Sequence, residues 1–421
     1  MSNSSQPGLR RRPARRAWKR LAPAGAAAIL GAGSAAVAGD YKVNPLVTDD
    51  PSVLAALGYG AAPTVDPALI NPWDFANAGT GPWVTANAGG NGGGGVAGTA
   101  SVYSGTGKIL SSAVSIPQAV GPAQGGMSGP VGPTGDVYAG GAGIMLPGGG
   151  EATYVFDNLD GSISGWDGTS ASAQTLLAGR TGGHLAAYTG LEIGASGGQT
   201  LLYAANNITG AIDVFNTALA PVTLAGAFVD PGANPDGLLP FNIQSIDGHL
   251  WVTYAAGGPA AASAPLGSGF VSEFNMDGTF VRRFATGGDL SSPWGVAIAP
   301  ANFGAYSNDV LIGNFNDTGG LGFISAYSLS GTFQGLLEQN GAPIVLPGLW
   351  ALQFGAGGDN GPTNALYFTA GIGAESHGLF GDIAAVPEPS SWATMLLGLG
   401  IVGAGFRGRR RTVNPRELPA A

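Results

Sequence analysis

The chain has 421 residues, 44% of them hydrophobic and only 10% charged, so it can bury a large core and is not an intrinsically disordered protein. The span from Gly39 to Val386 contains five basic and 24 acidic residues, which gives it a formal charge of −19. A span of that sign repels phosphate groups, which argues against nucleic-acid binding and against binding to anionic lipids. With no cysteine in the chain, disulfides and thiolate chemistry are excluded.

Residues 1–38 have the layout of a secretory signal peptide. A basic region ends at Arg20, an uncharged Ala- and Gly-rich stretch follows, and Ala36 and Ala38 supply small residues at −3 and −1 before Gly39. We expect cleavage there by signal peptidase; the alternative is a membrane helix that is retained. Arg15 and Arg16 resemble a twin-arginine signal only loosely, so the general secretory route is favoured.

Residues 39–385 contain a repeat of roughly 50–60 residues. Its three clearest copies begin near residues 70, 290 and 346, the first two with Pro before Trp73 and before Trp294, and weaker copies begin near residues 129, 188 and 238. Alternating apolar residues and Asp-Gly or Ser-Gly pairs inside each unit predict strands joined by tight hairpins.

Six units of about four strands each predict an all-β fold, a six-bladed β-propeller. The strands around residues 41–49 and 377–383 are expected to share the last blade and close the ring, and the Trp residues to pack between blades. A seven-bladed ring and a double β-sandwich remain alternatives. The Gly-rich segment 86–100 lacks the helix and the Gly-Lys-Ser/Thr pattern of a phosphate-binding loop, so we expect a plain connection there.

Catalytic motifs are sparse. His184, His249 and His377 are far apart and show no metal-ligand spacing, so turn or rim positions are favoured for each. Glu375 lies two residues before His377, and this pair is the one candidate for acid–base chemistry. We predict no catalytic residues.

Polar side chains in loops give a weaker signal. Asp160, Asp247 and Asp277 precede Gly at hairpin tips, where Asp is favoured by the turn itself. Oxygen-rich loops with Asn206, Asn207, Asn314 and Asp317 follow several predicted strands, and such loops can hold Ca²⁺, although no known calcium-loop pattern is present. Ca²⁺ is therefore an open expectation without assigned ligands. The polar groups predicted to face the propeller channel are Asn71, Asn242 and Asn314.

The C-terminus carries a second targeting signal, in addition to the signal peptide. Pro387, Glu388 and Pro389 precede an apolar stretch of about 15 residues, which as a helix spans only ~22 Å of a ~30 Å hydrocarbon core. An arginine cluster at the cytoplasmic side ends it: Arg407, Arg409, Arg410 and Arg411. Residues 386–411 thus form the signal and 412–421 a tail, the alternative being an ordinary C-terminal anchor.

This layout resembles the PEP-CTERM sorting signal of Gram-negative bacteria. The resemblance implies an exosortase-type membrane protease-transpeptidase as partner, contact with the inner membrane only through the sorting helix before processing, and release to the cell envelope, outer surface or extracellular matrix. The body, through segments such as Asn71-Pro72-Trp73 and Pro293-Trp294-Gly295, resembles an uncharacterised exported β-propeller-like family that carries this tail. Asp74 departs from it, since the family repeat has Gly after that Trp.

Two functions follow from these observations. The favoured one is a non-catalytic envelope or matrix propeller that binds exopolysaccharide or a protein partner. The alternative is a propeller hydrolase or lyase that acts on sugars or lactones with a divalent metal in the channel. The sequence favours the first, because no histidine or acid cluster repeats at the spacing of a propeller mouth.

Overall fold

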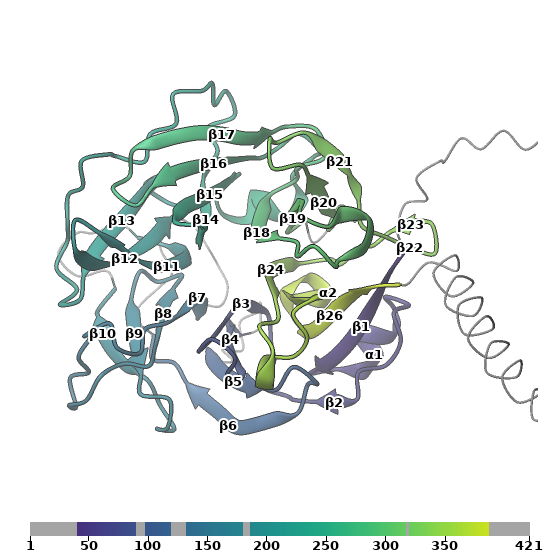
Figure 1. Ribbon diagram of the computed structural model, residues 1–421. Helices are drawn as coiled ribbons and strands as arrows, with labels where there is room; N and C mark the ends of the chain where they lie inside the picture. The colour runs from purple at the N-terminus through teal and green to yellow at the C-terminus, as the bar shows by residue number, and fades with distance from the viewer. Residues whose placement is uncertain (1–39, 90–96, 119–131, 180–185, 317–319, 387–421) are drawn as a thin grey trace, which may run out of the picture. The chain divides into compact units, whose positions relative to one another are not determined.

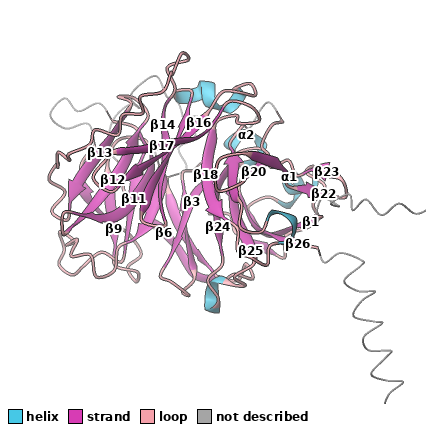
Figure 2. Ribbon diagram, turned by 45° about the horizontal axis from the view of Figure 1, so that its top comes forward, coloured by secondary structure: helices cyan, strands magenta, loops and turns pink. Residues whose placement is uncertain are grey.

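A computed structural model describes residues 40–89, 97–118, 132–179, 186–316 and 320–386. Regular structure in these residues is almost entirely β, and the helices are short segments beside the sheets (Figure 2). The all-β prediction is confirmed. The helical segments are α1 (Pro51–Ala55), α2 (Ile372–Glu375) and three 3₁₀ turns at Gly258–Ser263, Gly304–Tyr306 and Gly358–Asn360.

The strands form six blades around a common centre, antiparallel except for one parallel pair at the outer edge of blade 6, so the ring is six-bladed rather than seven-bladed or a sandwich (Figure 1). In blades 1–5 the chain enters at the innermost strand and moves outward. Blade 1 is β3 (Pro72–Asn77), β4 (Trp83–Asn87), β5 (Thr99–Tyr103) and β6 (Ile109–Ser115); blade 2 is β7 (Pro133–Tyr138), β8 (Tyr154–Asn158), β9 (Ile163–Trp166) and β10 (Gln174–Leu177). Blade 3 has three described strands, β11 (Tyr188–Ser196), β12 (Gln199–Asn206) and β13 (Ala211–Asn216).

The second half of the ring follows the same plan. Blade 4 is β14 (Leu239–Ile246), β15 (His249–Ala255), β16 (Phe270–Asn275) and β17 (Phe280–Thr286); blade 5 is β18 (Pro293–Ile298), β19 (Val310–Asn314), β20 (Ile324–Tyr327) and β21 (Phe333–Leu336). A small hairpin, β22 (Glu338–Gln339) and β23 (Ala342–Pro343), leads to blade 6. Blade 6 contains β24 (Leu349–Phe354), β25 (Ala365–Ala370), β26 (Leu379–Ala385), β1 (Tyr41–Thr48) and β2 (Thr64–Val65).

The two ends of the described chain close the ring, as the sequence predicted. β1 pairs with β26 in antiparallel register, from Tyr41 opposite Ala385 to Thr48 opposite Leu379. The ladder extends one step further, because the Val386 N–H donates to the Asp40 carbonyl at 2.8 Å. The last blade therefore exists only when strands from both ends of the chain have paired.

Each inner strand begins with features that the repeated sequence encodes. Pro72, Pro133 and Pro293 are first residues of β3, β7 and β18, where a missing N–H costs no ladder bond. In three copies the preceding backbone has positive φ: 49° at Asn71, 53° at Ser292 and 67° at Gly348. The same local bend thus sets the entry of β3, β18 and β24 into the ring.

The hydrophobic core lies mainly between neighbouring blades. Val84 of blade 1 packs in one cluster with Phe156 of blade 2, and Tyr203 of blade 3 in another with Val252 of blade 4. Each sheet is therefore covered on both faces, so the strands read as largely apolar runs. None of the described helices is long and apolar enough to cross a membrane.

Candidate functional site

A cavity of about 630 Å³ lies among the second halves of the six inner strands. All six blades contribute to its wall. Most of its polar side chains come from blades 1–4, principally Asp74, Asn77, Asp136, Glu192 and Gln244. Blades 5 and 6 supply mostly apolar residues, principally Val296, Ile298, Leu352 and Phe354.

The first halves of the same strands carry an aromatic cluster instead. Trp73 stacks on Trp350 with ring centroids 3.6 Å apart, and Phe315 stacks on the same Trp350 at 3.9 Å. Phe241 of blade 4 reaches Trp73 of blade 1, and the Trp294 indole N–H donates to the Thr189 carbonyl of blade 3. Two of these contacts join adjacent blades, 1 with 6 and 5 with 6, and the other two join the non-adjacent blades 1 with 4 and 3 with 5. The Trp residues therefore pack between blades, as expected, and they also meet across the axis on which the inner strands converge.

In blades 1–5, the position after the aromatic or equivalent residue holds one inner strand to the next. Where it is Gly, the backbones approach directly; a Cβ on Gly295 would lie 2.6 Å from the Trp350 carbonyl oxygen. Where it is polar, the side chain bridges the gap: Asp74 accepts from the Asp136 N–H, and Asn242 donates to the Trp294 carbonyl. Asp74, the departure noted in the sequence, thus replaces a close backbone contact with a hydrogen bond.

Four carboxyl groups gather where blades 1, 2 and 3 meet. Asp157 and Asp136 are 0% and 3% exposed, and Asp74 and Glu192 are half-buried. Burial raises the pKa of Asp157 to about 7, although the hydrogen bond from the Thr134 hydroxyl stabilises the charged form and opposes the rise. Burial also raises the pKa of Glu192 to about 7, and there the opposing hydrogen bond comes from the backbone N–H of Ser245. Burial, with their mutual repulsion, raises the pKa of Asp74 and of Asp136 well above the usual range.

The three predicted channel-facing amides are all buried. Asn71 donates to Glu375 and accepts from the Trp350 indole, and Asn242 donates to the Trp294 carbonyl. Asn314 accepts from the Ser291 N–H and donates to the Phe323 carbonyl. The residues that line the cavity are others, so a ligand role for these amides stays a prediction. The acids around Asp136 were not singled out, because their spacing differs from blade to blade and no local motif connects them.

The hairpin acids behave as turn residues. Asp160 accepts from both the N–H and the hydroxyl of Ser162, and Asp277 does the same with Thr279. Those bonds lower the pKa of Asp277. Asp247 sits at a positive φ of 51° in the β14–β15 turn, where it lies at the edge of the cavity.

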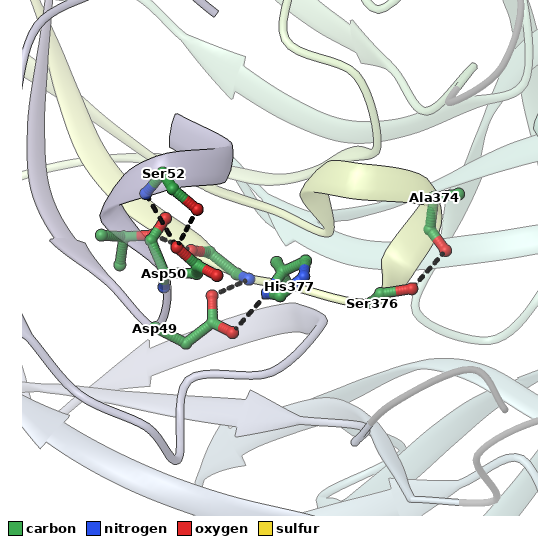
Figure 3. Close-up of polar contacts among 8 residues, drawn as sticks. Asp49, Asp50, Ser52, Ala374, Ser376 and His377 are labelled. Atoms are coloured by element: carbon green, nitrogen blue, oxygen red, sulfur yellow. Dashed lines mark hydrogen bonds and ion pairs between the residues drawn. The ribbon is translucent and has the colours of Figure 1, made fainter. Parts of the chain in front are cut away.

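Two of the histidines are described, and each faces a carboxylate. His249 lies 3.3 Å from Glu273, which also binds Arg282. His377 Nδ1 lies 2.8 Å from Asp49 Oδ2, while the other oxygen of Asp49 accepts from the Gly378 N–H (Figure 3). Its sequence neighbour Glu375 instead accepts from Asn71. His377 therefore joins the segment before β26 to the β1–α1 connection. The carboxylate beside its Nδ1 is that of Asp49, whereas the sequence paired it with Glu375.

No group of three or more His, Asp or Glu side chains among the described residues is placed to hold a metal ion. Ca²⁺ binding, which can also use amide and carbonyl oxygens, stays a prediction. Several other predictions fall outside the described residues: the signal-peptide residues Ala36 and Ala38, the sorting-signal residues 387–411 including the proposed short membrane helix, His184 and Asp317.

Residues 385–411 match the family model of the PEP-CTERM protein-sorting motif. The match begins at Ala385, the last residue of β26, so the sorting motif follows the closing blade directly. The chain therefore carries an export and sorting signal fused to a six-bladed propeller.

The body is similar to uncharacterised proteins of Acanthamoeba polyphaga mimivirus. One is 32% identical over 48% of this chain and 49% of its own length, and a second is 32% identical over 48% and 52%. The chain thus spans about half the length of these curated relatives. Among solved structures, a protein of unknown function from Bacteroides thetaiotaomicron aligns over 82% of this chain and 76% of its own, with 8% identity and a TM-score of 0.46.

Proposed function

We propose that this exported protein is processed by an exosortase-type enzyme and acts in the cell envelope or extracellular matrix as a non-catalytic binding propeller. Its partner is a polysaccharide or a protein of the matrix. The observation that carries the proposal is the combination of the sorting motif at 385–411 with a cavity bounded by all six blades.

The geometry of the inner strands supports binding rather than turnover. Three polar side chains of the wall are engaged with the scaffold: Asp74 and Glu192 accept backbone N–H groups of the next inner strand, and Gln244 accepts from the Val296 N–H. Groups fixed in this way hold the ring together and form a rigid wall. A rigid wall suits recognition, because little conformational entropy is lost on binding.

The role of the sorting signal is tested by replacing Pro387, Glu388 and Pro389 with Ala. The full-length protein should then accumulate in the inner membrane, whereas the wild-type protein leaves it with a shortened C-terminus by mass spectrometry. A composition-matched control in the tail, Pro415, Glu417 and Pro419 to Ala, should be sorted normally. Unchanged processing of the Pro-Glu-Pro variant would remove the exosortase from this proposal.

The binding role is tested with the processed protein. The purified processed protein should bind to extracellular polysaccharide or matrix prepared from the producing cells. In cells that express the Pro-Glu-Pro variant, the protein should be absent from the matrix fraction. Release of reducing ends or other cleavage products from that polysaccharide would contradict a non-catalytic role.

A further inference from the structure

Two polar groups in the wall of the cavity have no hydrogen-bond partner in the described protein. Both carboxyl oxygens of Asp136 are buried and unpaired, and so is the amide nitrogen of Asn77. Both residues line the cavity, Asp136 from β7 and Asn77 from the end of the neighbouring strand β3. Buried polar groups in folded proteins are almost always satisfied, so these two demand hydrogen bonds from whatever occupies the cavity.

The charge of the wall narrows the class of ligand. Its carboxyl groups are Asp74, Asp136, Glu192 and Asp247, and no lysine or arginine is among the lining residues. An anionic ligand would meet only like charge and no counter-ion. Acidic sugars, phosphates and sulfates are therefore excluded from this cavity.

Asp136 is surrounded by groups that keep it protonated. Asp74 faces it from β3, and Asp157 and Tyr154 face it from β8. The backbone N–H of Ala76 opposes the rise of its pKa but does not reach hydrogen-bond geometry. Burial and the Asp74 charge both raise the pKa of Asp136 well above its usual range, which favours the protonated form of its carboxyl group. A neutral carboxylic acid offers one hydroxyl donor and one carbonyl acceptor.

Resting on the binding function proposed above, we propose that this cavity binds a neutral, hydroxyl-rich ligand, one or two units of an uncharged sugar, through the Asp136 carboxylic acid and the Asn77 amide. A sugar hydroxyl can donate to one group and accept from the other, which matches a wall with both donors and acceptors. On the apolar side of the wall, the partly exposed Ile298 and Phe354 suit the C–H face of a sugar ring. The volume of about 630 Å³ lies in the ordinary range for small-ligand sites.

A cationic amine is the competing ligand for an acidic cavity. An ammonium group only donates, so it would leave the Asn77 N–H₂ unpaired and would require Asp136 to ionise. The two ligand classes predict opposite dependences on pH. Binding of a neutral sugar should weaken as the acids ionise on raising the pH, whereas binding of an amine should strengthen.

The experiment is calorimetric titration of the processed protein with a panel of neutral hexose and pentose disaccharides, with glucosamine as the cationic probe and glucuronate as the anionic one. At least one neutral disaccharide should bind, with an affinity at least tenfold higher at pH 5.5 than at pH 8.5. Glucuronate should not bind at either pH.

Substitutions of Asp136 separate the alternatives. Asp136→Asn keeps one donor and one acceptor in place, so sugar binding should persist and lose its pH dependence. Asp136→Leu removes both and should weaken binding at least tenfold. Asp236→Asn, an exposed acid in the β13–β14 loop, is the matched control and should bind as the wild type does. Thermal melting identifies any variant that fails to fold.

Three results would overturn the inference. The first is preferential binding of glucosamine that Asp136→Asn abolishes. The second is sugar binding that Asp136→Leu leaves unchanged. The third is that no neutral disaccharide binds at concentrations up to roughly 50 mM, beyond which a dissociation constant no longer indicates a specific site. In that case water alone would satisfy the Asp136 carboxyl and the Asn77 amide. Retention on matrix polysaccharide in that last case would leave the proposed function standing and place its binding surface elsewhere.

Discussion

The two halves of the inner strands show how one repeated element can serve two purposes. The first halves bring Trp73, Trp294 and Trp350 together at the axis, where Trp294 and Trp350 are fully buried. The second halves, only a few residues further along, surround a cavity with carboxyl groups on one side. Stability is concentrated where the repeat is regular, and the candidate site lies where the blades differ from one another.

The largest expected effect is the loss of an axial Trp. Trp294→Ala should lower the free energy of unfolding by about 3–5 kcal/mol, because it leaves a large cavity in the centre of the ring and unpairs the Thr189 carbonyl. Urea unfolding measures the change. Phe333→Ala, at an aromatic residue that is 43% exposed, should cost less than about 1 kcal/mol. A Trp294→Ala protein as stable as the Phe333→Ala one would disprove the structural role of the first halves.

The next effect concerns the amide that orients this cluster. Asn71→Ala should destabilise the protein by about 2–3 kcal/mol, since it unpairs the Trp350 indole N–H and forces Ala into positive φ. Asn71→Gly removes the same hydrogen bonds but accepts that φ, so its cost should be about 1 kcal/mol smaller. Equal losses from thermal or urea unfolding would mean that the backbone bend at the start of β3 contributes nothing.

The first halves of the inner strands, where the repeat is regular, could be predicted from the sequence, whereas the acidic wall formed by the second halves could not. Pro-Trp at residues 72–73 and 293–294 is a local pattern, and together with its weaker copies it predicted the inner strands and the blade number correctly. The segments 41–49 and 377–383 predicted the closing strands. The axial meeting of the Trp residues was missed, because a repeat gives the position of a side chain within its blade and not its neighbours across the ring. Asp74, Asp136 and Glu192 come together through contacts between residues about 55–120 positions apart, which no spacing rule detects.

The acidic half should make stability depend on pH. Since the pKa of Asp157 is about 7 in the folded protein and near 3.8 when unfolded, the folded state binds its proton more tightly. The stabilisation is complete below about pH 4 and is lost as the pH rises through 7, which is worth about 2 kcal/mol between pH 5.5 and 8 for one such group.

Thermal melts across pH 5.5–8 measure this loss. The wild-type midpoint should fall as the pH rises, and Asp157→Asn should flatten the slope, whereas the exposed-site control Asp236→Asn should not. Glu192, also with a pKa of about 7, keeps part of the slope in the Asp157 variant. A midpoint that rises with pH over this range would show that the cluster is ionised in the folded state.

The smallest expected effect is that of divalent cations. The span from Gly39 to Val386 carries a formal charge of −19, so it attracts cations to its surface without a dedicated site. Millimolar Ca²⁺ should therefore stabilise the fold by less than about 1 kcal/mol relative to chelator at matched ionic strength, through mass action on the folded state.

Magnesium distinguishes a diffuse effect from a site. Mg²⁺ at the same concentration should raise the midpoint as much as Ca²⁺ does, because a surface field responds to charge, whereas a coordination site selects by size and ligand number. A shift that is large and specific for Ca²⁺ would instead reveal convergent oxygens. Repeating the melt with Asp136→Asn then tells whether they belong to the cavity: a calcium site among these acids would be lost in that variant, and a site elsewhere in the chain would keep the full shift.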